Sequence, residues 1–198
     1  AHPFDGGKAV ALYPSFDKTA SELRADQGAY TSLLSILVNR WPDLLPDILG
    51  PLKFPSHPLA FAEFGLNALG SAEGLAARFT SPEARALWIG MAAHGIQPLS
   101  NLSTAAIAMV LLAAAHGSGW PVPAGGSQSV ADAMAACFRK LGGVIETGVE
   151  VKGLQQIPSA RAILFDLGPR QLLKIAGHRF SSLYRWQLER YRYGMGGF

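Results

Sequence analysis

The sequence has 198 residues, of which 49% are hydrophobic and 16% charged, and its formal net charge is +3. This composition excludes a disordered chain, which has low hydrophobicity and high net charge. It also argues against nucleic-acid binding, which needs a concentrated basic face. The longest uninterrupted apolar run covers residues 105–115 and is about half of the ~20 residues that a transmembrane helix needs.

The first part of the chain, residues 1–118, is predicted to be almost entirely helical. A short strand is expected over residues 8–13, because glycine and proline bound this apolar run. Asp17 and Asp26 are predicted to cap the first two helices, and three prolines are expected to break residues 42–51 into short turns. Further helices are predicted over residues 59–69, from Ser81 to about His94, and over the apolar run 105–115.

Residues 119–198 have a different character. A helix is predicted to begin at Ser127 or Ser129, after one glycine pair, and to end before a second pair, Gly142 and Gly143. The chain is therefore expected to belong to the α+β class and to be predominantly helical. After this helix the pattern predicts strands over residues 144–147, 150–154 and 161–167, and then helices over residues 169–175 and 182–191.

No motif identifies a catalytic residue. The sequence contains no complete G-x-G-x-x-G, no P-loop and no nucleophile elbow. His94 and His116 end apolar helices, where a histidine commonly interacts with the last carbonyls, so a structural role is favoured for both. Cys137 has no Cys or His at ligand spacing, so no metal site is predicted, and it is expected to be a small core residue. A single cysteine and the lack of a signal peptide indicate a cytoplasmic protein.

Two stretches leave an alternative open. Residues 170–192 contain six Lys or Arg and one acid, which is typical of a solvated helix face; the alternative is attraction to a membrane surface or to an anionic ligand. The helix over residues 105–115 is expected to be ordinary core, or else to line a tunnel for a long apolar substrate, because small residues leave room beside it. The candidate pocket residues are Ala105, Ala108, Met109, Leu112 and Ala113.

The segment WPVPAGGSQSVADAMAACFRKLGGVIETGVEVKGL, residues 120–154, contains P-x-G-G, a helix, and then G-G-x-I-x-T followed by spaced apolar residues. It resembles the phytoene dehydrogenase-like branch of the FAD-dependent oxidoreductases, which is related to the amine oxidases. HPFDGGKAVAL, SPEARALWIGMAAHGIQPL, ARAILFDLGPRQLLKIAG and YRWQLERYRYG also resemble this branch, in the same order. The resemblance thus covers nearly the whole chain.

The resemblance implies that the chain is the middle of a longer FAD-dependent oxidoreductase. Residues 1–118 would form a mostly helical substrate-binding lobe, and residues 119–198 would return to a discontinuous FAD-binding domain as a smaller α/β segment. The glycine fingerprint for the pyrophosphate would lie elsewhere in the parent, so this chain alone is expected to be inactive and not to retain FAD. The implied partners are an apolar, isoprenoid- or carotenoid-like substrate and the flanking parts of the parent chain.

The same resemblance implies a set of cofactor contacts. Backbone groups at Val151 would meet the adenine of FAD. Leu167, Gly168 and Pro169 would lie at the carboxyl end of a strand, where α/β folds bind nucleotides, and a side chain at position 168 would crowd the ligand. The resemblance supplies no catalytic acid or base. The alternative function is a non-catalytic helical module that binds a lipid or another hydrophobic molecule.

Overall fold

The computed structural model describes residues 1–51 and 53–194; Leu52 and residues 195–198, the last four of the predicted return segment, lie outside the described residues. The described chain forms two compact units, Ala1–Pro121 and Val122–Gly194, which we call the N-terminal unit and the C-terminal unit. The fold belongs to the α+β class and is predominantly helical, since the strands assigned in the described residues form one small antiparallel sheet.

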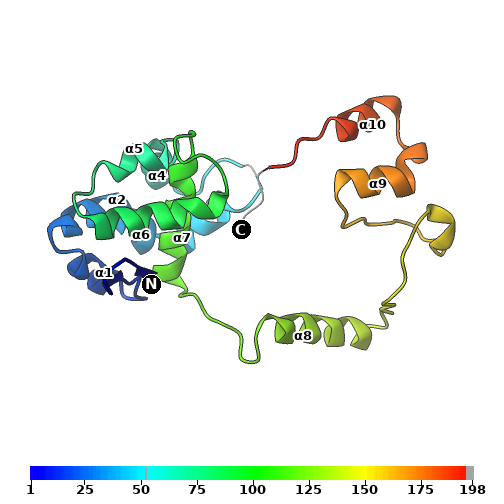
Figure 1. The fold of residues 1–198 in the computed structure, drawn as a ribbon, viewed down its shortest axis with the longest axis horizontal. Coiled ribbons are helices and arrows are strands. Elements are labelled where there is room, and N and C mark those ends of the chain that lie inside the picture. The colour runs from blue at the N-terminus through cyan, green and yellow to red at the C-terminus, as the bar shows by residue number, and fades with distance from the viewer. Residues whose placement is uncertain (52, 195–198) are drawn as a thin grey trace. The chain divides into compact units, whose positions relative to one another are not determined.

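The N-terminal unit is a group of helices preceded by a short hairpin (Figure 1). The hairpin pairs β1 (His2–Pro3) with β2 (Ala9–Val10), with His2 opposite Val10. The helical elements follow in the order α1 (Phe16–Glu22), η1 (Arg24–Asp26), α2 (Gln27–Asn39), α3 (Trp41–Ile48), α4 (Pro58–Ala68), α5 (Ala72–Ala76), α6 (Pro82–Ala92), η2 (Ala93–Gly95) and α7 (Thr104–Gly117).

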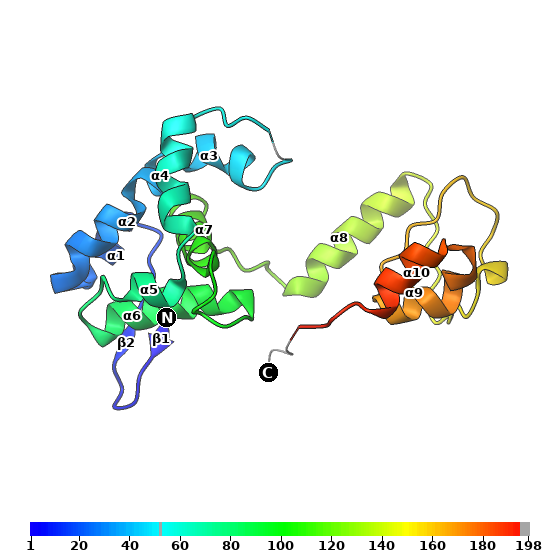
Figure 2. The ribbon, with the colours of Figure 1, turned by 90° about the horizontal axis from the view of Figure 1, so that it is seen from above.

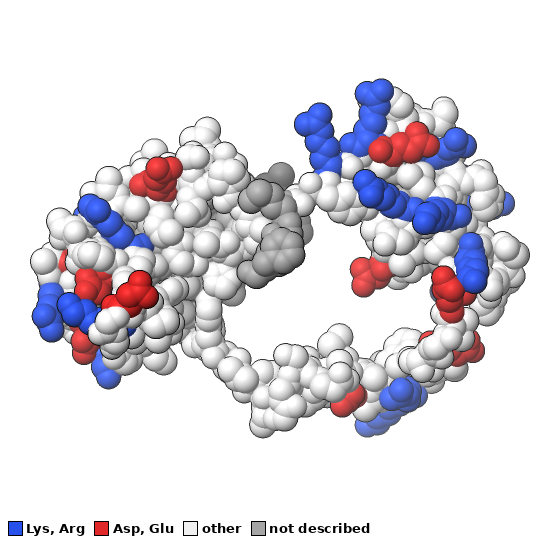
Figure 3. All heavy atoms as spheres, viewed as in Figure 1, with Lys and Arg blue, Asp and Glu red and all other residues white. Residues whose placement is uncertain are grey.

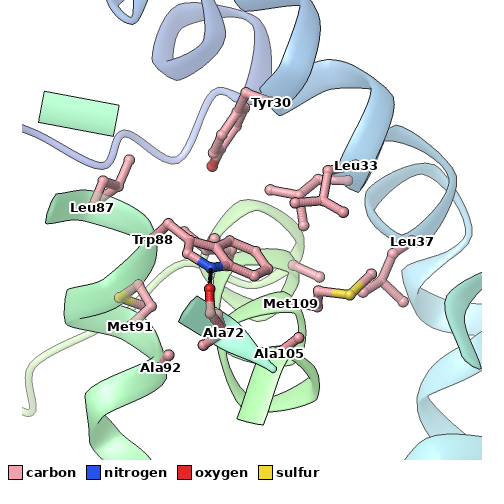
Figure 4. Packing of buried hydrophobic residues seen from close by; sticks show 14 of the residues in the cluster. Tyr30, Leu33, Leu37, Ala72, Leu87, Trp88, Met91, Ala92, Ala105 and Met109 are labelled. Atoms are coloured by element: carbon pink, nitrogen blue, oxygen red, sulfur yellow. Dashed lines mark hydrogen bonds between the residues drawn. The ribbon is translucent and has the colours of Figure 1, made fainter. Parts of the chain in front are cut away.

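Helix α7 is the centre of the hydrophobic core, packed against α2, α4, α5 and α6. It is apolar on all sides, as expected of a helix with neighbours all round. Against it lies Trp88 of α6, fully buried, whose indole N–H donates a hydrogen bond to the Ala72 carbonyl at 2.8 Å (Figure 4). This bond satisfies the indole and ties α6 to α5. Each fully buried large side chain of this core contributes roughly 1.5–3 kcal/mol.

Asp26 occupies the N-cap position of α2 as predicted, but its side chain makes no capping hydrogen bond there, because its carboxylate instead holds the start of α6. The residue is 1% exposed, and its oxygens accept hydrogen bonds from the backbone N–H groups of Thr80 and Ser81 at 2.7 and 2.8 Å and from both hydroxyls. Burial opposes ionisation, but the bonds from Ser81 and Thr80 outweigh it and lower the pKa of Asp26 to about 2. Ser81 also caps α6 itself, accepting from the Ala84 N–H at 3.2 Å.

Two local predictions in this unit are wrong. The N-cap of α1 is Ser15, which accepts from the Lys18 N–H at 3.2 Å, and Asp17 lies in the first turn. Residues 42–51 do not form only turns, because Pro42 and Pro46 both lie within α3. Pro42 occupies the first turn, where a missing N–H leaves no helical bond unmade, and the burial of Trp41 and Leu44 on the core holds the helix in place.

The C-terminal unit contains α8 (Ser127–Lys140), η3 (Leu154–Gln156), α9 (Pro169–Ala176), η4 (Gly177–Arg179) and α10 (Ser182–Glu189). Helices α9 and α10 pack against each other (Figure 2). The glycine pairs bound α8 as predicted. Gly126 precedes it with φ 82°, and Gly142 follows it with φ 87°, both values that favour glycine. The N–H groups of Gly142 and Gly143 return to the carbonyls of Arg139 and Phe138, at 2.9 and 3.0 Å, in a Schellman motif.

The strands predicted over residues 144–147, 150–154 and 161–167 are wrong: within the described C-terminal unit no strand is assigned. A strand needs a neighbouring strand to bind its backbone N–H and C=O groups. Here several apolar side chains of these stretches face solvent instead, and Leu164 is 95% exposed. Local bonds replace part of the ladder, since Gln156 Oε1 accepts from the N–H groups of Lys152 and Gly153 at 2.6 and 3.2 Å.

Helix α8 exposes an apolar face. Val130, Met134, Phe138 and the following Leu141 recur at helical spacing, and all are exposed. No residue of α8 is buried. Cys137 is exposed too, so its prediction as a core residue is wrong. The reason is tertiary, because in the described chain no other element packs extensively on this helix.

Candidate functional site

The residues predicted to contact FAD all lie in the C-terminal unit, at or near the surface. Val151 is half-buried and precedes η3; Leu167 is exposed; Gly168 and Pro169 begin α9 and are half-buried. The last three lie together only because they are consecutive in the sequence. No hydrogen bond within the described chain joins Val151 to them.

The start of α9 is already occupied by a side chain. The Tyr193 hydroxyl accepts a hydrogen bond from the Arg170 N–H at 3.4 Å, and the Arg170 guanidinium lies 5.3 Å from the centre of the Tyr193 ring. A Cβ added at Gly168 would lie 2.7 Å from the Gln171 side-chain oxygen and 3.3 Å from the Tyr193 hydroxyl. Space beside Gly168 is therefore limited by Gln171 and Tyr193, both of which belong to this chain.

The residues predicted to line a substrate pocket all lie on α7, inside the core. Ala105, Ala108, Leu112 and Ala113 are completely buried, and Met109 is 1% exposed. Met109 alone among them borders a cavity, which is narrow and lies between α2 and α4. The small residues on α7 let neighbouring helices approach closely, so the space that they leave is filled by protein. Their role in substrate binding stays a prediction.

His116, at the end of α7, lies in a cluster of structural contacts. Its Nε2 lies 2.7 Å from the Tyr30 hydroxyl and its Nδ1 lies 3.3 Å from the Pro14 carbonyl oxygen, while the Phe16 ring packs edge-on at 5.2 Å. Burial lowers the pKa of His116, although backbone carbonyls of Pro14 and Tyr13 act in the opposite direction. The histidine joins the end of α7 to α2 and the N-terminal segment.

The N-terminal unit also contains an open cleft of about 540 Å³ that the sequence did not reveal. One wall is the junction of α2 and α3, and the other is the first two turns of α4. Its volume falls within the range of small-molecule sites, ~300–1,000 Å³. Most of the lining surface is apolar, although polar residues also line the cleft: the apolar residues are Ile36, Pro58, Leu59 and Ala60, and the polar residues are Asn39, Arg40, Ser56, His57 and Glu63.

Asp47 fixes the position of the cleft's rim. Its carboxylate accepts a hydrogen bond from the Ser56 N–H at 2.8 Å and forms a salt bridge with the Lys53 ammonium at 3.0 Å. The hydrogen bond from Lys53 lowers the pKa of Asp47, with a smaller contribution from Ser56 against the effect of burial. The connection between α3 and α4 is thus anchored next to His57, the N-cap residue of α4.

Several polar groups of this cleft have no partner in the described chain. The side chains of Asn39 and Arg40 take part in no hydrogen bond or salt bridge there, and His57 Nδ1 is buried without any partner. Unpaired donors beside apolar surface are typical of a binding site. Sequence reasoning missed Arg40 and His57 because they are 17 positions apart and only the packing of α2 on α4 brings them to one cleft.

The Lys and Arg residues of the basic stretch, residues 170–192, are exposed, and Figure 3 shows Lys and Arg side chains gathered over α9 and α10. Arg190 packs over the Trp186 ring at 4.5 Å, which is a cation–π contact within one helix turn. These residues form a solvated face. Their attraction to a membrane surface stays a prediction, and in the described residues no helix is both long and apolar enough to cross a bilayer.

Comparison with known proteins gives no match: no protein-family model, no curated protein and no solved structure is similar to this chain at a significant level. In the described residues no three His, Cys, Asp or Glu side chains converge in a way that could hold a metal ion. The function must therefore be argued from the sequence pattern and from the two units themselves.

Proposed function

We propose that the chain is part of an FAD-dependent oxidoreductase similar to the phytoene dehydrogenases. In this proposal the N-terminal unit belongs to the substrate-binding lobe and the C-terminal unit to the FAD-binding domain. The substrate is apolar, isoprenoid- or carotenoid-like, and FAD supplies the redox chemistry by accepting a hydride equivalent from substrate carbon. In this proposal the parent is cytoplasmic, and the basic residues 170–192 form the surface that would meet a membrane.

The observation that carries the proposal is the contrast in burial between the two units. The N-terminal unit has a complete hydrophobic core. The C-terminal unit leaves large apolar side chains in solvent along α8 and along the segments after it, including Phe138, Val144 and Leu164. Exposed apolar surface of this kind marks a place where another element or partner binds. A segment that returns to a discontinuous domain needs a cover of this kind from flanking parts of its own protein.

The residues present fit only part of an FAD site. Val151 offers backbone groups for the adenine, and Leu167, Gly168 and Pro169 border the same ligand in this proposal. Each neutral hydrogen bond gains about 0.5–1.5 kcal/mol net, whereas micromolar affinity requires about 8 kcal/mol. The pyrophosphate needs a helix N-terminus with free N–H groups, but at α9 the Arg170 N–H is bound to Tyr193. This chain alone should therefore not retain FAD.

Gel filtration after incubation with FAD tests the proposal. Two samples are compared: this chain and the complete polypeptide encoded by its reading frame. We expect the chain to elute colourless and the complete polypeptide to elute yellow with stoichiometric flavin. A colourless complete polypeptide refutes the flavoprotein proposal. A yellow peak for this chain alone shows that the cofactor residues are misplaced.

The second candidate function is a non-catalytic helical module that binds a hydrophobic molecule. The open cleft between α2, α3 and α4 favours it, because the cleft lies wholly within the N-terminal unit and has an apolar lining. It requires no flavin and no residue of the C-terminal unit. The colour of the complete polypeptide separates the two functions.

A further inference from the structure

We propose that the cleft formed by the α2–α3 junction and the start of α4 binds a small monocarboxylate with an apolar body, such as a medium-chain fatty acid. The inference does not rest on the flavin proposal, because every lining residue lies between positions 36 and 63. The ligand class follows from the groups that line the cleft.

The apolar part of the cleft selects an aliphatic ligand body. Ile36 of α2 and Leu59 and Ala60 of α4 contribute apolar surface. Ile36 and Leu59 are exposed in the structure, although both are large hydrophobic residues. A bound alkyl chain would remove this surface from water, which is the main source of affinity for such a ligand.

The polar part of the cleft supplies donors for an anion. Arg40 presents a planar guanidinium, which is suited to a carboxylate because two parallel N–H groups can each bind one oxygen. No carboxylate of the described residues forms a salt bridge with it. The Asn39 amide adds a further donor, also without a partner in the described chain.

His57 contributes a third donor. Its Nδ1 is buried without a partner, so a proton on that nitrogen would lose its bond to water without gaining another. Its Nε2 is not among the buried unpaired atoms and makes no hydrogen bond in the described chain, so the ring offers an unused polar atom to the cleft. His57 also directly precedes α4 as its N-cap residue, and the N–H groups of Leu59 and Ala60 in the first turn add a positive end to the same wall.

Glu63 is the one acidic residue that lines the cleft, one turn further along α4. Its carboxylate repels an anion and so favours a ligand with a single negative charge, which Arg40 and His57 can bind. A dicarboxylate or a phosphate would bring more charge close to Glu63. Removing this carboxylate should therefore strengthen the binding of a monocarboxylate.

Isothermal titration calorimetry of the full chain with decanoate and decan-1-ol at neutral pH tests the proposal. The two probes share the alkyl body and differ in the charged head. We expect decanoate to bind at least about 10-fold more tightly than the alcohol. Equal affinities, or no binding of decanoate within its soluble range, would overturn the assignment.

Variants locate the binding in the cleft. Arg40→Gln should weaken decanoate binding by about 10- to 100-fold, and Glu63→Gln should tighten it. Arg78→Gln is the matched control, because Arg78 is also exposed and lies outside the cleft. A decanoate affinity that Arg40→Gln leaves unchanged contradicts the proposal.

A second pair of variants avoids any effect on the α2–α3 junction. Leu59 and Leu66 are both exposed residues of α4, but only Leu59 lines the cleft. Leu59→Glu should weaken decanoate binding at least about 10-fold by charge repulsion and lost apolar contact. Leu66→Glu should leave the affinity unchanged. Equal losses in both variants would show that the ligand binds elsewhere.

Discussion

Helices α7 and α8 have 14 residues each, yet they show opposite patterns of burial. Half of the residues of α7 are buried against neighbouring helices, whereas α8 has no buried residue. Met109 and Met134, one near the middle of each helix, make the contrast plain, because they are 1% and 69% exposed. Similar local signals for a helix thus lead to very different contributions to stability.

The difference teaches what packing adds to helix formation. Most helical stability in proteins comes from the burial of an apolar face, and isolated helices of this length are marginal in water. Helix α8 has strong local ends, with Gly126 before it and the Schellman motif of Gly142 after it. The ends of α8 define where that helix begins and ends. The stability of α7 comes instead from its burial in the core of the N-terminal unit.

Hydrogen exchange should show the largest difference between the two units. Amides of α7 open only with global unfolding, for which ~5–15 kcal/mol is typical, while residues 144–167 have few buried contacts. We expect α7 amides to exchange at least about 1,000-fold more slowly than amides in residues 144–167, measured by NMR or mass spectrometry. Comparable protection in both regions would show that the C-terminal unit has a core in solution.

Truncating the two methionines sharpens the comparison. Met109→Ala removes a buried side chain from the core and should lower the free energy of unfolding of the N-terminal unit by about 2–5 kcal/mol. Met134→Ala should change stability by no more than about 0.5 kcal/mol. Urea unfolding followed by circular dichroism measures both. If Met134→Ala destabilises the chain as much as Met109→Ala, the apolar face of α8 is covered in solution.

Acid should destabilise the N-terminal unit through Asp26. Because its folded-state pKa is about 2 and its unfolded-state pKa is about 3.9, the ionised carboxylate stabilises the fold above that unfolded value. This contribution, about 2 kcal/mol, should be lost as the pH falls from about 4 to 2. When the free energy of unfolding is measured against pH, it should fall less on acidification in Asp26→Asn than in the unsubstituted chain.

Asp5→Asn is the control for this measurement, since Asp5 is an exposed carboxylate in a turn. Asp5→Asn should show the same dependence of the unfolding free energy on pH as the unsubstituted chain. Asp26→Asn should in addition be less stable at neutral pH, because an amide cannot accept all the bonds from Thr80 and Ser81. An unchanged pH dependence in Asp26→Asn would mean that this carboxylate is not the acid-sensitive group.

Local signals in the sequence were sufficient where a helix end is defined by its own residues. Ser81 followed by Pro82 predicted the start of α6, and Gly142 and Gly143 predicted the end of α8. The all-apolar run predicted the buried helix α7, since such a helix must be enclosed. These features depend on neighbours within a few positions, so one sequence is enough to find them.

Features that depend on distant partners were beyond the sequence. Asp26 has the residue type of an N-cap, but the N–H groups it binds lie more than 50 positions away. Residues 161–167 have the composition of a strand, yet without a neighbouring strand their backbone forms no ladder. The cleft likewise depends on how α2, α3 and α4 pack, which brings Arg40 to His57.

The hydrogen bond between the Trp88 indole and the Ala72 carbonyl gives the chain an internal spectroscopic reporter. Trp41 and Trp88 are buried in the N-terminal unit, whereas Trp186 of the C-terminal unit is exposed. Indole fluorescence shifts to longer wavelength and becomes accessible to soluble quenchers when the ring meets water. Emission at the blue edge of the spectrum therefore follows the core around Trp88. The quenchable red edge comes from the exposed rings of Trp120 in the N-terminal unit and Trp186 in the C-terminal unit, so the core around Trp88 can be followed without an added label.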